Sequence, residues 1–216
     1  MTIKVILVDD HVVVRQALKS SLDKERELEV GGEAGDGREG VRMAREIKPN
    51  VVVMDIAMPN LNGVEATRQI VAENPDVRVL ALSMHSDRLL VAEMLKAGAA
   101  GYLVKQCTFS EMVEAIRAVA AGNTYLSPTV TGPVVEGFLG RQPRTDSPAF
   151  TLLSPREREV LQLMAEGLGT RQIANQLNIS VSTVETHRRQ LKTKLHIDSY
   201  AGLIKFAISE GLTTLD

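Results

Sequence analysis

The stretch that decides the fold is Val51-Val52-Val53-Met54-Asp55-Ile56-Ala57-Met58-Pro59. Its first four residues are apolar and mostly β-branched, which is typical of a short strand buried on both faces of a parallel sheet. The apolar run ends abruptly at Asp55, and Pro59 and Gly63 mark a turn soon after it. This pattern predicts that Asp55 lies at the carboxyl end of a strand, where open α/β sheets bind ligands. For this stretch alone, a turn aspartate that starts the next helix is the simpler alternative.

The composition limits the class of protein. The chain has 216 residues, 44% of them hydrophobic, which is enough for two domains with separate cores. Its formal net charge of -2 excludes a globally basic nucleic-acid binder, so any DNA contact needs a local basic patch. The single cysteine, Cys107, excludes an intramolecular disulfide. Because no signal peptide precedes Asp9 and Asp10 and no apolar run approaches the roughly 20 residues of a membrane helix, we expect a soluble, cytoplasmic protein with no membrane partner.

Five β-α units follow one another in residues 1–126. The expected strands are 3–8, 28–34, 51–55, 77–82 and 101–104. Each is followed by a segment in which apolar residues recur at helical spacing. Parallel strands joined by helices predict an α/β fold, a doubly wound five-stranded parallel sheet with helices on both faces. Of the two common strand orders we expect the flavodoxin-like order 2-1-3-4-5.

Polar residues stand at the carboxyl ends of four of these strands. They are Asp9 with Asp10, Asp55, Ser83 and Lys105. In the order 2-1-3-4-5 the first and third strands are neighbours, so the three carboxylates come together. Oxygen ligands suit Mg²⁺, and a lysine and a hydroxyl beside them would complete a cradle for a phosphoryl group. The simpler alternatives are that Asp10 caps the first helix and that Lys105 is a solvated strand end.

Residues 1–126 resemble the receiver domain of bacterial response regulators. The resemblance is carried by Asp9-Asp10, Asp55 with Met58-Pro59 and Gly63, Ser83, and Tyr102-Leu103-Val104-Lys105. It implies that Asp55 accepts a phosphoryl group from a sensor histidine kinase. The implied Mg²⁺ ligands are Asp9, Asp10, Asp55 and the backbone carbonyl of Ala57.

The same resemblance assigns roles to the other strand ends. Lys105 would pair with the phosphoryl group and Ser83 would close over it. Tyr102 corresponds to an aromatic residue that turns inward on activation, although simple packing is the alternative for a tyrosine in a strand. We interpret His85, two residues after Ser83, as no more than a modulator of dephosphorylation.

Residues 127–150 are interpreted as a linker, because they hold half of the eight prolines in the chain. Within them, residues 129–139 predict a short helix with Val130, Val134, Val135 and Phe138 on one face. Residues 141–147 show no apolar period, so we expect them to be mobile.

Residues 151–216 predict a small all-α domain of four helices. The helix starts are marked by Ser154 in a capping box with Glu157, and by Thr170, Ser180 and Ser199. The second and third helices, joined by a short turn, predict a helix-turn-helix.

The third helix decides between a DNA reader and a structural bundle. Val184, Leu191 and Leu195, with Val181 nearby, form the apolar stripe that we expect to face the core. Residues 180–195 carry four basic side chains against one acid, so the outer face of the helix is cationic. A cationic outer face on the second helix of a helix-turn-helix indicates DNA binding. An ordinary solvated helix face is the alternative.

This segment resembles the LuxR-type DNA-binding domain. The resemblance is carried by residues 153–161, Ile173-Ala174, Ile179-Ser180, Thr183-Val184, His187 and Lys194-Leu195. The candidate DNA contacts are Ser182, Thr183, Glu185, Thr186, Arg188, Arg189, Lys192 and Lys194. Glu185 departs from the family, in which a lysine is frequent at that position. With its receiver-like part, the chain resembles response regulators of the NarL/FixJ class.

The resemblance implies a transcriptional regulator of a two-component system whose DNA binding depends on phosphorylation of Asp55. Its implied partners are a sensor histidine kinase, double-stranded DNA, a second copy of the chain when phosphorylated or on DNA, and RNA polymerase as a candidate. The chain would not be an enzyme beyond phosphorylating and dephosphorylating itself. One alternative is a DNA-binding regulator that acts independently of phosphorylation. Another is a phosphate-transferring enzyme, which is disfavoured because Ala57 stands where such hydrolases place a second aspartate.

Overall fold

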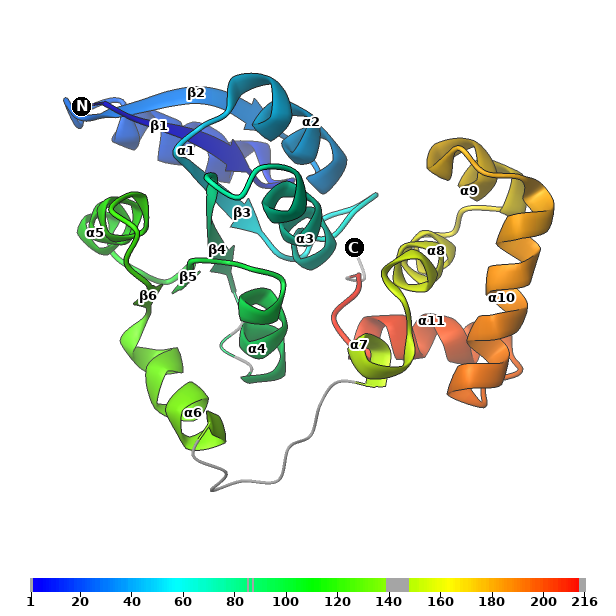
Figure 1. The fold of residues 1–216 in the computed structure, drawn as a ribbon. Helices are drawn as coiled ribbons and strands as arrows, with labels where there is room; N and C mark the ends of the chain where they lie inside the picture. The colour runs from blue at the N-terminus through cyan, green and yellow to red at the C-terminus, as the bar shows by residue number, and fades with distance from the viewer. Residues whose placement is uncertain (1, 85, 87, 139–147, 214–216) are drawn as a thin grey trace. The chain divides into compact units, whose positions relative to one another are not determined.

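The computed structural model describes residues 2–84, 86, 88–138 and 148–213 (Figure 1). The chain divides into two compact units, Met1–Arg144 and Thr145–Asp216, which are treated separately below. His85 and residues 141–147, for which the sequence suggested roles, lie outside the described residues. Within the described ranges, no helix is both long enough and apolar enough to cross a membrane.

The first unit is built on one parallel sheet. Its described strands are β1 (Ile3–Val8), β2 (Leu28–Ala34), β3 (Val51–Asp55), β4 (Arg78–Ser83), β5 (Gly101–Val104) and β6 (Tyr125–Leu126). They lie in the order β2-β1-β3-β4-β5-β6, which confirms the predicted doubly wound order. The sequence does not predict the two-residue β6, which pairs with β5 at the edge of the sheet.

Helices cover both faces of this sheet (Figure 1). They are α1 (Val12–Leu22), α2 (Gly37–Ile47), α3 (Gly63–Glu73), α4 (Arg88–Lys96) and α5 (Phe109–Ala120). Successive side chains of a strand point to opposite faces. Leu7 and Val53 therefore pack with residues of α1 and α5 in one core. Val8 and Met54 pack with residues of α2 and α3 in the other, so β3 is buried on both sides as predicted.

Capping side chains set the first turns of α2 and α5. The side chain of Asp36 accepts a hydrogen bond from the N–H of Glu39 and starts α2 at Gly37. A capping box between Thr108 and Glu111 starts α5 at Phe109. Apolar periodicity is a poor guide to helix starts, because the first turn is set by capping side chains rather than by burial.

The connection from β3 to α3 is held tightly against the strand. The N–H of Gly63 donates a hydrogen bond of 2.8 Å to the carbonyl of Ile56. A Cβ atom at Gly63 would lie 2.1 Å from the carbonyl oxygen of Asp55. Only glycine lets the start of α3 approach the Asp55 backbone this closely. The position of Asp55 therefore depends on Gly63.

The stretch predicted as a short helix after the sheet forms α6 (Pro128–Phe138), which contacts α4 in the first unit. Val130 is buried and Val134 is half-buried. Val135 is 48% exposed, so it does not share the buried face. The boundaries of the domains and of the linker at residues 126 and 151 stay a prediction.

Five helices form the described part of the second unit. They are α7 (Pro148–Leu152), α8 (Pro155–Ala165), α9 (Thr170–Leu177), α10 (Val181–Leu195) and α11 (Tyr200–Ser209). The last four correspond to the predicted helices, whereas the sequence does not predict α7. Ser154, Ser180 and Ser199 cap their helices as predicted. The prediction for Thr170 is wrong, because Gly169 is the N-cap residue and Thr170 is already helical.

Changing Gly63 to alanine should lower the free energy of unfolding by about 3 kcal/mol, the upper end for overpacking, because the new methyl group meets rigid backbone. Urea denaturation of the variant and the wild type measures this loss. The matched control is Gly132→Ala in α6, where an added Cβ has nothing within 4 Å. Because alanine favours a helix over glycine, the control should be neutral or slightly stabilising. Equal stability of Gly63→Ala and wild type would contradict the close approach.

Candidate functional site

Three carboxylates come together at one edge of the sheet. Asp9 and Asp10 directly follow β1, and Asp55 is the last residue of β3. These strands are neighbours, with Val8 paired to Met54, so both strands deliver their acids to the same place. Asp9 and Asp55 are 2% and 4% exposed, which means that two of the three acids are taken out of water. An arrangement of this kind needs positive charge nearby.

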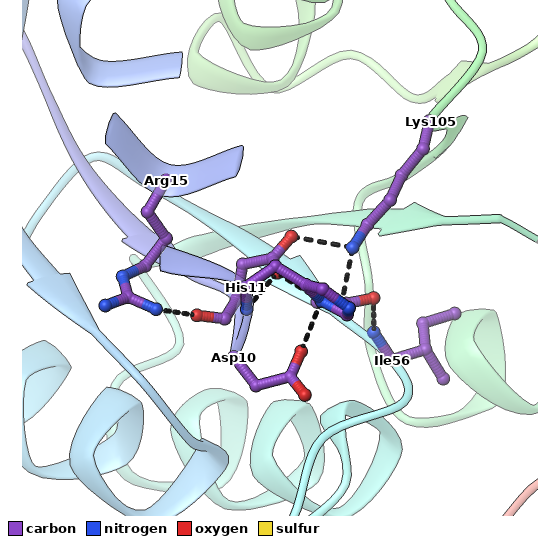
Figure 2. A network of polar contacts seen from close by, with 7 residues as sticks. Asp10, His11, Arg15, Ile56 and Lys105 are labelled. Atoms are coloured by element: carbon purple, nitrogen blue, oxygen red, sulfur yellow. Dashed lines mark hydrogen bonds and ion pairs between the residues drawn. The ribbon is translucent and has the colours of Figure 1, made fainter. Parts of the chain in front are cut away.

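Lys105 supplies that charge from the end of β5 (Figure 2). Its Nζ atom lies 2.7 Å from Oδ2 of Asp9 and 2.7 Å from Oδ2 of Asp55. The N–H of Ile56 donates a 2.7 Å hydrogen bond to the other oxygen of Asp55, Oδ1. Both oxygens of Asp55 are therefore held by hydrogen-bond donors, and its carboxylate is fixed in one orientation.

The pKa of Asp55 reports this environment. Burial raises its pKa to about 6, and the nearby charge of Asp9 adds to the effect. Hydrogen bonding and charge from Lys105, together with the N–H of Ile56, oppose that rise. The dominant cause is desolvation, so Asp55 is a carboxylate held in water-poor surroundings beside a single ammonium group.

The remaining donor atoms form a set that could hold a cation. One ligand atom from each of Asp9, Asp10, His11 and Asp55 lies within 4.8 Å of all the others. Oδ1 of Asp10 is buried and makes no well-aligned hydrogen bond to any described residue, although Nδ1 of His11 lies 2.8 Å away. A buried carboxylate oxygen without a donor is suited to a metal ion. The structure thus brings together the predicted Asp9, Asp10 and Asp55, and it adds His11.

The other predicted residues of this site lie on the same edge or in the adjoining strands. Ser83 ends β4, is buried, and its carbonyl accepts the N–H of Lys105 at 2.7 Å. Tyr102 lies in β5 and is completely buried, opposite Ala81 of β4. Ala57 is half-buried in the connection that follows β3. Strand pairing places Ser83 opposite Val104, next to Lys105, and Ala57 follows Asp55 by two residues.

The second unit carries the predicted helix-turn-helix in α9 and α10. Asn178 adopts the left-handed conformation and ends α9, and Ser180 accepts the N–H of Thr183 to start α10. Val184 and Leu191 are buried and Leu195 is half-buried, as the predicted stripe requires. The expectation for Val181 is wrong, because its side chain is 44% exposed at the first turn of the helix.

The predicted DNA-contacting residues lie mostly on the open side of α10. Those with exposed side chains are Ser182, Glu185, Thr186, Arg189, Lys192 and Lys194. Thr183 and Arg188 are only half-buried. A shallow hollow on this side is lined by Glu185, Arg188, Arg189 and Lys192. The helix therefore presents a mainly basic surface to solvent.

Part of the charge on α10 is used within the unit. Arg188 donates to Oγ1 of Thr170 at 2.6 Å and to Oε1 of Glu185 at 3.1 Å. Thr170 in turn donates to the same oxygen of Glu185 at 2.9 Å. Glu185 is thus fixed against the start of α9. The sequence carries no signal for this contact, because Thr170 and Glu185 meet only through the turn between the helices.

Lys194 is held in a similar way. Its Nζ atom lies 2.7 Å from Oε2 of Glu157 at the start of α8, the same oxygen that accepts the N–H of Ser154. Although burial alone would raise the pKa of Glu157, Lys194 and Ser154 lower it below its usual range. By contrast, within the described part of the chain the side chains of Arg189 and Lys192 make no hydrogen bond or ion pair. These two cations are available to a ligand.

Comparison with known proteins divides the chain in the same two parts. Residues 5–117 match the response regulator receiver domain, and residues 151–207 match the bacterial regulatory proteins of the luxR family. The transcriptional regulatory protein MctR of Rhizobium johnstonii is 40% identical over 98% of this chain and 96% of its own. The oxygen regulatory protein NreC of Staphylococcus carnosus is 35% identical over 97% of this chain and 98% of its own.

A solved structure shows the same likeness. It is a two-component response regulator of the LuxR family from Aurantimonas sp. SI85-9A1, with 34% sequence identity and a TM-score of 0.61. The match covers 64% of this chain and 99% of that chain.

Changing Lys105 to methionine should destabilise the protein by about 3 to 5 kcal/mol at pH 8 in EDTA, because two buried carboxylates lose their cation. The loss should shrink at pH 5. Asp55 has its pKa raised to about 6 in the folded state, so the folded protein takes up a proton there as the pH falls. Without Lys105 that pKa rises further, and protonation of Asp55 relieves the repulsion. Urea denaturation at the two pH values measures the difference.

The control is Lys24→Met, which removes an exposed lysine from the same unit. It should change the stability little at either pH. A loss for Lys105→Met that is the same at pH 5 and pH 8 would show that packing, and not charge, explains the role of Lys105.

Proposed function

Because the chain belongs to the response regulators that join a receiver domain to a LuxR-type helix-turn-helix, we propose that phosphorylation of Asp55 controls its binding to DNA. As a two-component transcriptional regulator it has a kinase and DNA as partners. The observation that carries the proposal is the buried Asp55 carboxylate, held between the ammonium of Lys105 and the N–H of Ile56. Such a carboxylate is oriented for nucleophilic attack, and the ammonium of Lys105 can stabilise the negative charge that a phosphoryl group brings.

In the proposed transfer an oxygen of Asp55 attacks the phosphorus of a phosphohistidine on a sensor kinase. The new P–O bond forms as the P–N bond breaks, and the histidine nitrogen leaves with the electron pair. Lys105 already contacts Oδ2 of Asp55, so its ammonium can follow the negative charge onto the phosphoryl oxygens. The chain's own chemistry is limited to this phosphorylation and to the later hydrolysis of the acyl phosphate.

We further propose that the receiver works with Mg²⁺. The donors would be Asp9, Asp10, Asp55 and the carbonyl of Ala57. Two observations support it: the carboxylates outnumber the ammonium of Lys105, and Oδ1 of Asp10 is buried without an aligned donor among the described residues. When bound, the ion supplies positive charge that offsets the repulsion between the acids and an incoming phosphoryl group.

Ser83 and Tyr102 are proposed as the switch. Ser83 is the last residue of β4, the strand that pairs with β3, and its carbonyl accepts the N–H of Lys105. Because of this hydrogen bond, a shift of either residue would move the other. A phosphoryl group on Asp55 offers acceptors to the Ser83 hydroxyl. Tyr102 lies two residues before Val104, the partner of Ser83, in the buried position that the packed state of the switch requires. Two packed arrangements of these residues would give the regulator its two states.

For DNA we propose that α10 enters the major groove. Arg189 and Thr186 would meet base edges, and Lys192 would meet phosphate. Ser182, Thr183, Glu185, Arg188 and Lys194 stay proposed contacts. The bonds of Arg188 to Thr170 and of Lys194 to Glu157 suggest that these two cations also position the helix. A homodimer on DNA and contact with RNA polymerase belong to the same proposal.

Acetyl phosphate with Mg²⁺ should phosphorylate the wild type at Asp55 and tighten its binding to DNA. EDTA should abolish labelling, because the acids then repel the phosphoryl donor. Intact-protein mass spectrometry and DNA titration of the same samples measure the two effects. Asp55→Asn should show no adduct and no tightening, whereas Asp36→Asn, which alters a helix cap in the same unit, should still be labelled.

Undiminished labelling of Asp55→Asn would refute the assignment of the phosphoacceptor. Normal labelling with unchanged DNA affinity would instead support a regulator that acts independently of phosphorylation.

Arg189→Ala should weaken binding to a duplex chosen by in vitro selection by about 1 to 3 kcal/mol, and binding to random DNA by less. Lys192→Ala should weaken binding to both alike and reduce the slope of log affinity against log salt by about 0.9. Titrations at several salt concentrations measure both quantities. Lys205→Ala removes an exposed lysine from α11 and should change neither. Equal losses of Arg189→Ala on both duplexes would mean that α10 is rotated in the groove.

A further inference from the structure

His11 stands where a helix cap is expected but does not act as one. It is the N-cap residue of α1, and in the described chain its side chain makes no capping hydrogen bond. Serine, threonine, aspartate and asparagine are the side chains that favour this position. Instead the ring lies toward the acids (Figure 2), with Nδ1 at 2.8 Å from Oδ1 of Asp10 and 3.2 Å from Oδ1 of Asp9. Helix capping therefore does not account for the orientation of the ring.

The distances fit neighbouring ligands of one metal ion. In an octahedral shell with bonds of about 2.0 to 2.1 Å, adjacent donor atoms lie about 2.9 Å apart. The two separations from Nδ1 of His11 bracket this value. Oδ1 of Asp10, its nearer neighbour, makes no aligned hydrogen bond within the described ranges. Nδ1 of His11 is within hydrogen-bond distance of Oδ1 of Asp9, and this contact depends on which ring nitrogen carries the proton. With the proton on Nε2 the lone pair of Nδ1 is directed at the acids, and a cation among these donor atoms would replace that contact.

The neighbouring cation does not occupy this space. Lys105 binds the Oδ2 atoms of Asp9 and Asp55. Oδ1 of Asp9 instead accepts the main-chain N–H of His11 at 2.9 Å, which fixes the histidine beside the acid. The carbonyl of Asp9 is in turn held by Arg15 at 2.5 Å. Asp9 thus contacts His11 through Oδ1 and Lys105 through Oδ2, so a metal beside His11 and the lysine can act on this acid at once.

We propose that Nδ1 of His11 is a nitrogen ligand of the divalent cation at this site and makes the receiver favour manganese and later transition-metal ions over magnesium. The inference rests on the proposed function, in which the acids hold a cation. Imidazole is a common ligand of transition metals, whereas Mg²⁺ prefers oxygen. The ring binds in its neutral form, with its proton on Nε2 and the lone pair of Nδ1 on the metal. Its side chain is 65% exposed, so the ring can exchange its contact with Asp10 for one with the ion.

Mn²⁺ is the probe, because it is paramagnetic and accepts both oxygen and nitrogen ligands. Pulsed electron paramagnetic resonance of the full-length protein with Mn²⁺ should show coupling to an imidazole nitrogen. His11→Gln should lose this coupling and bind Mn²⁺ about tenfold more weakly. Its affinity for Mg²⁺, measured by competition with Mn²⁺, should change little. Circular dichroism of the variant checks that the fold is kept.

Two controls separate His11 from His196 and His85. His196→Asn removes an exposed imidazole from the second unit at a left-handed position that asparagine tolerates, and it should keep the coupling. His85→Gln should keep it as well. A coupling that survives His11→Gln, or that disappears with His85→Gln, would overturn the proposal.

Asp10→Asn distinguishes a failure of this inference from a failure of the metal site itself. Mn²⁺ that binds to the wild type and is lost in Asp10→Asn, yet shows no nitrogen coupling, means that the acids hold the ion without His11. Mn²⁺ binding that is the same in wild type and Asp10→Asn means that the proposed site does not exist, and the inference fails with it.

Discussion

The first unit depends on one buried ion-pair arrangement, in which the ammonium of Lys105 lies 2.7 Å from Asp9 and 2.7 Å from Asp55. Two carboxylates that are almost completely buried would repel each other and lose their hydration without a cation. Lys105 meets this requirement from the end of β5, two strands away from Asp55. The parallel sheet must therefore hold β1, β3 and β5 with their carboxyl ends at one edge, and the order of the strands does so.

The connection after β3 fixes the same carboxylate from the backbone side. Gly63 packs against the Asp55 backbone, and the N–H of Ile56 binds the Asp55 side chain. Both contacts remove freedom from the carboxylate. Burial raises the pKa of Asp55 to about 6, and this effect is larger than the lowering by Lys105. A carboxylate fixed in this way would need little reorganisation in the proposed phosphorylation.

In the second unit the basic residues of α10 divide into two kinds. The side chains of Arg188 and Lys194 bind residues of α9 and α8, whereas the side chains of Arg189 and Lys192 make no hydrogen bond or ion pair in the part of the chain that the structure describes. A count of charges along the sequence does not distinguish these four basic residues. The structure distinguishes them because an ion pair within the unit must be exchanged before a phosphate can be bound, whereas an unpaired cation has only its water to lose.

Local chemistry accounts for what could be predicted from the sequence. The apolar runs at β1 and β3, the capping box of Ser154 and the caps at Ser180 and Ser199 depend on neighbours a few residues away, and the structure confirms all of them. The wrong assignments were also local in origin. Thr170 is a favoured capping residue, but Gly169 before it takes that position, and Val181 is apolar but faces solvent at the first turn.

The sequence by itself determined the type of fold and which acids, lysine and hydroxyl stand at strand ends, because apolar periodicity and strand ends can be read residue by residue. It left two common strand orders, and the pairing of the strands in the structure decided between them. Only the tertiary structure decided that His11 turns toward the acids instead of capping α1, that Glu185 binds Thr170, and that Lys194 binds Glu157. The last two contacts join residues 15 and 37 positions apart. Their geometry depends on how helices and strands pack, and side-chain identity alone leaves several partners open for each charged group.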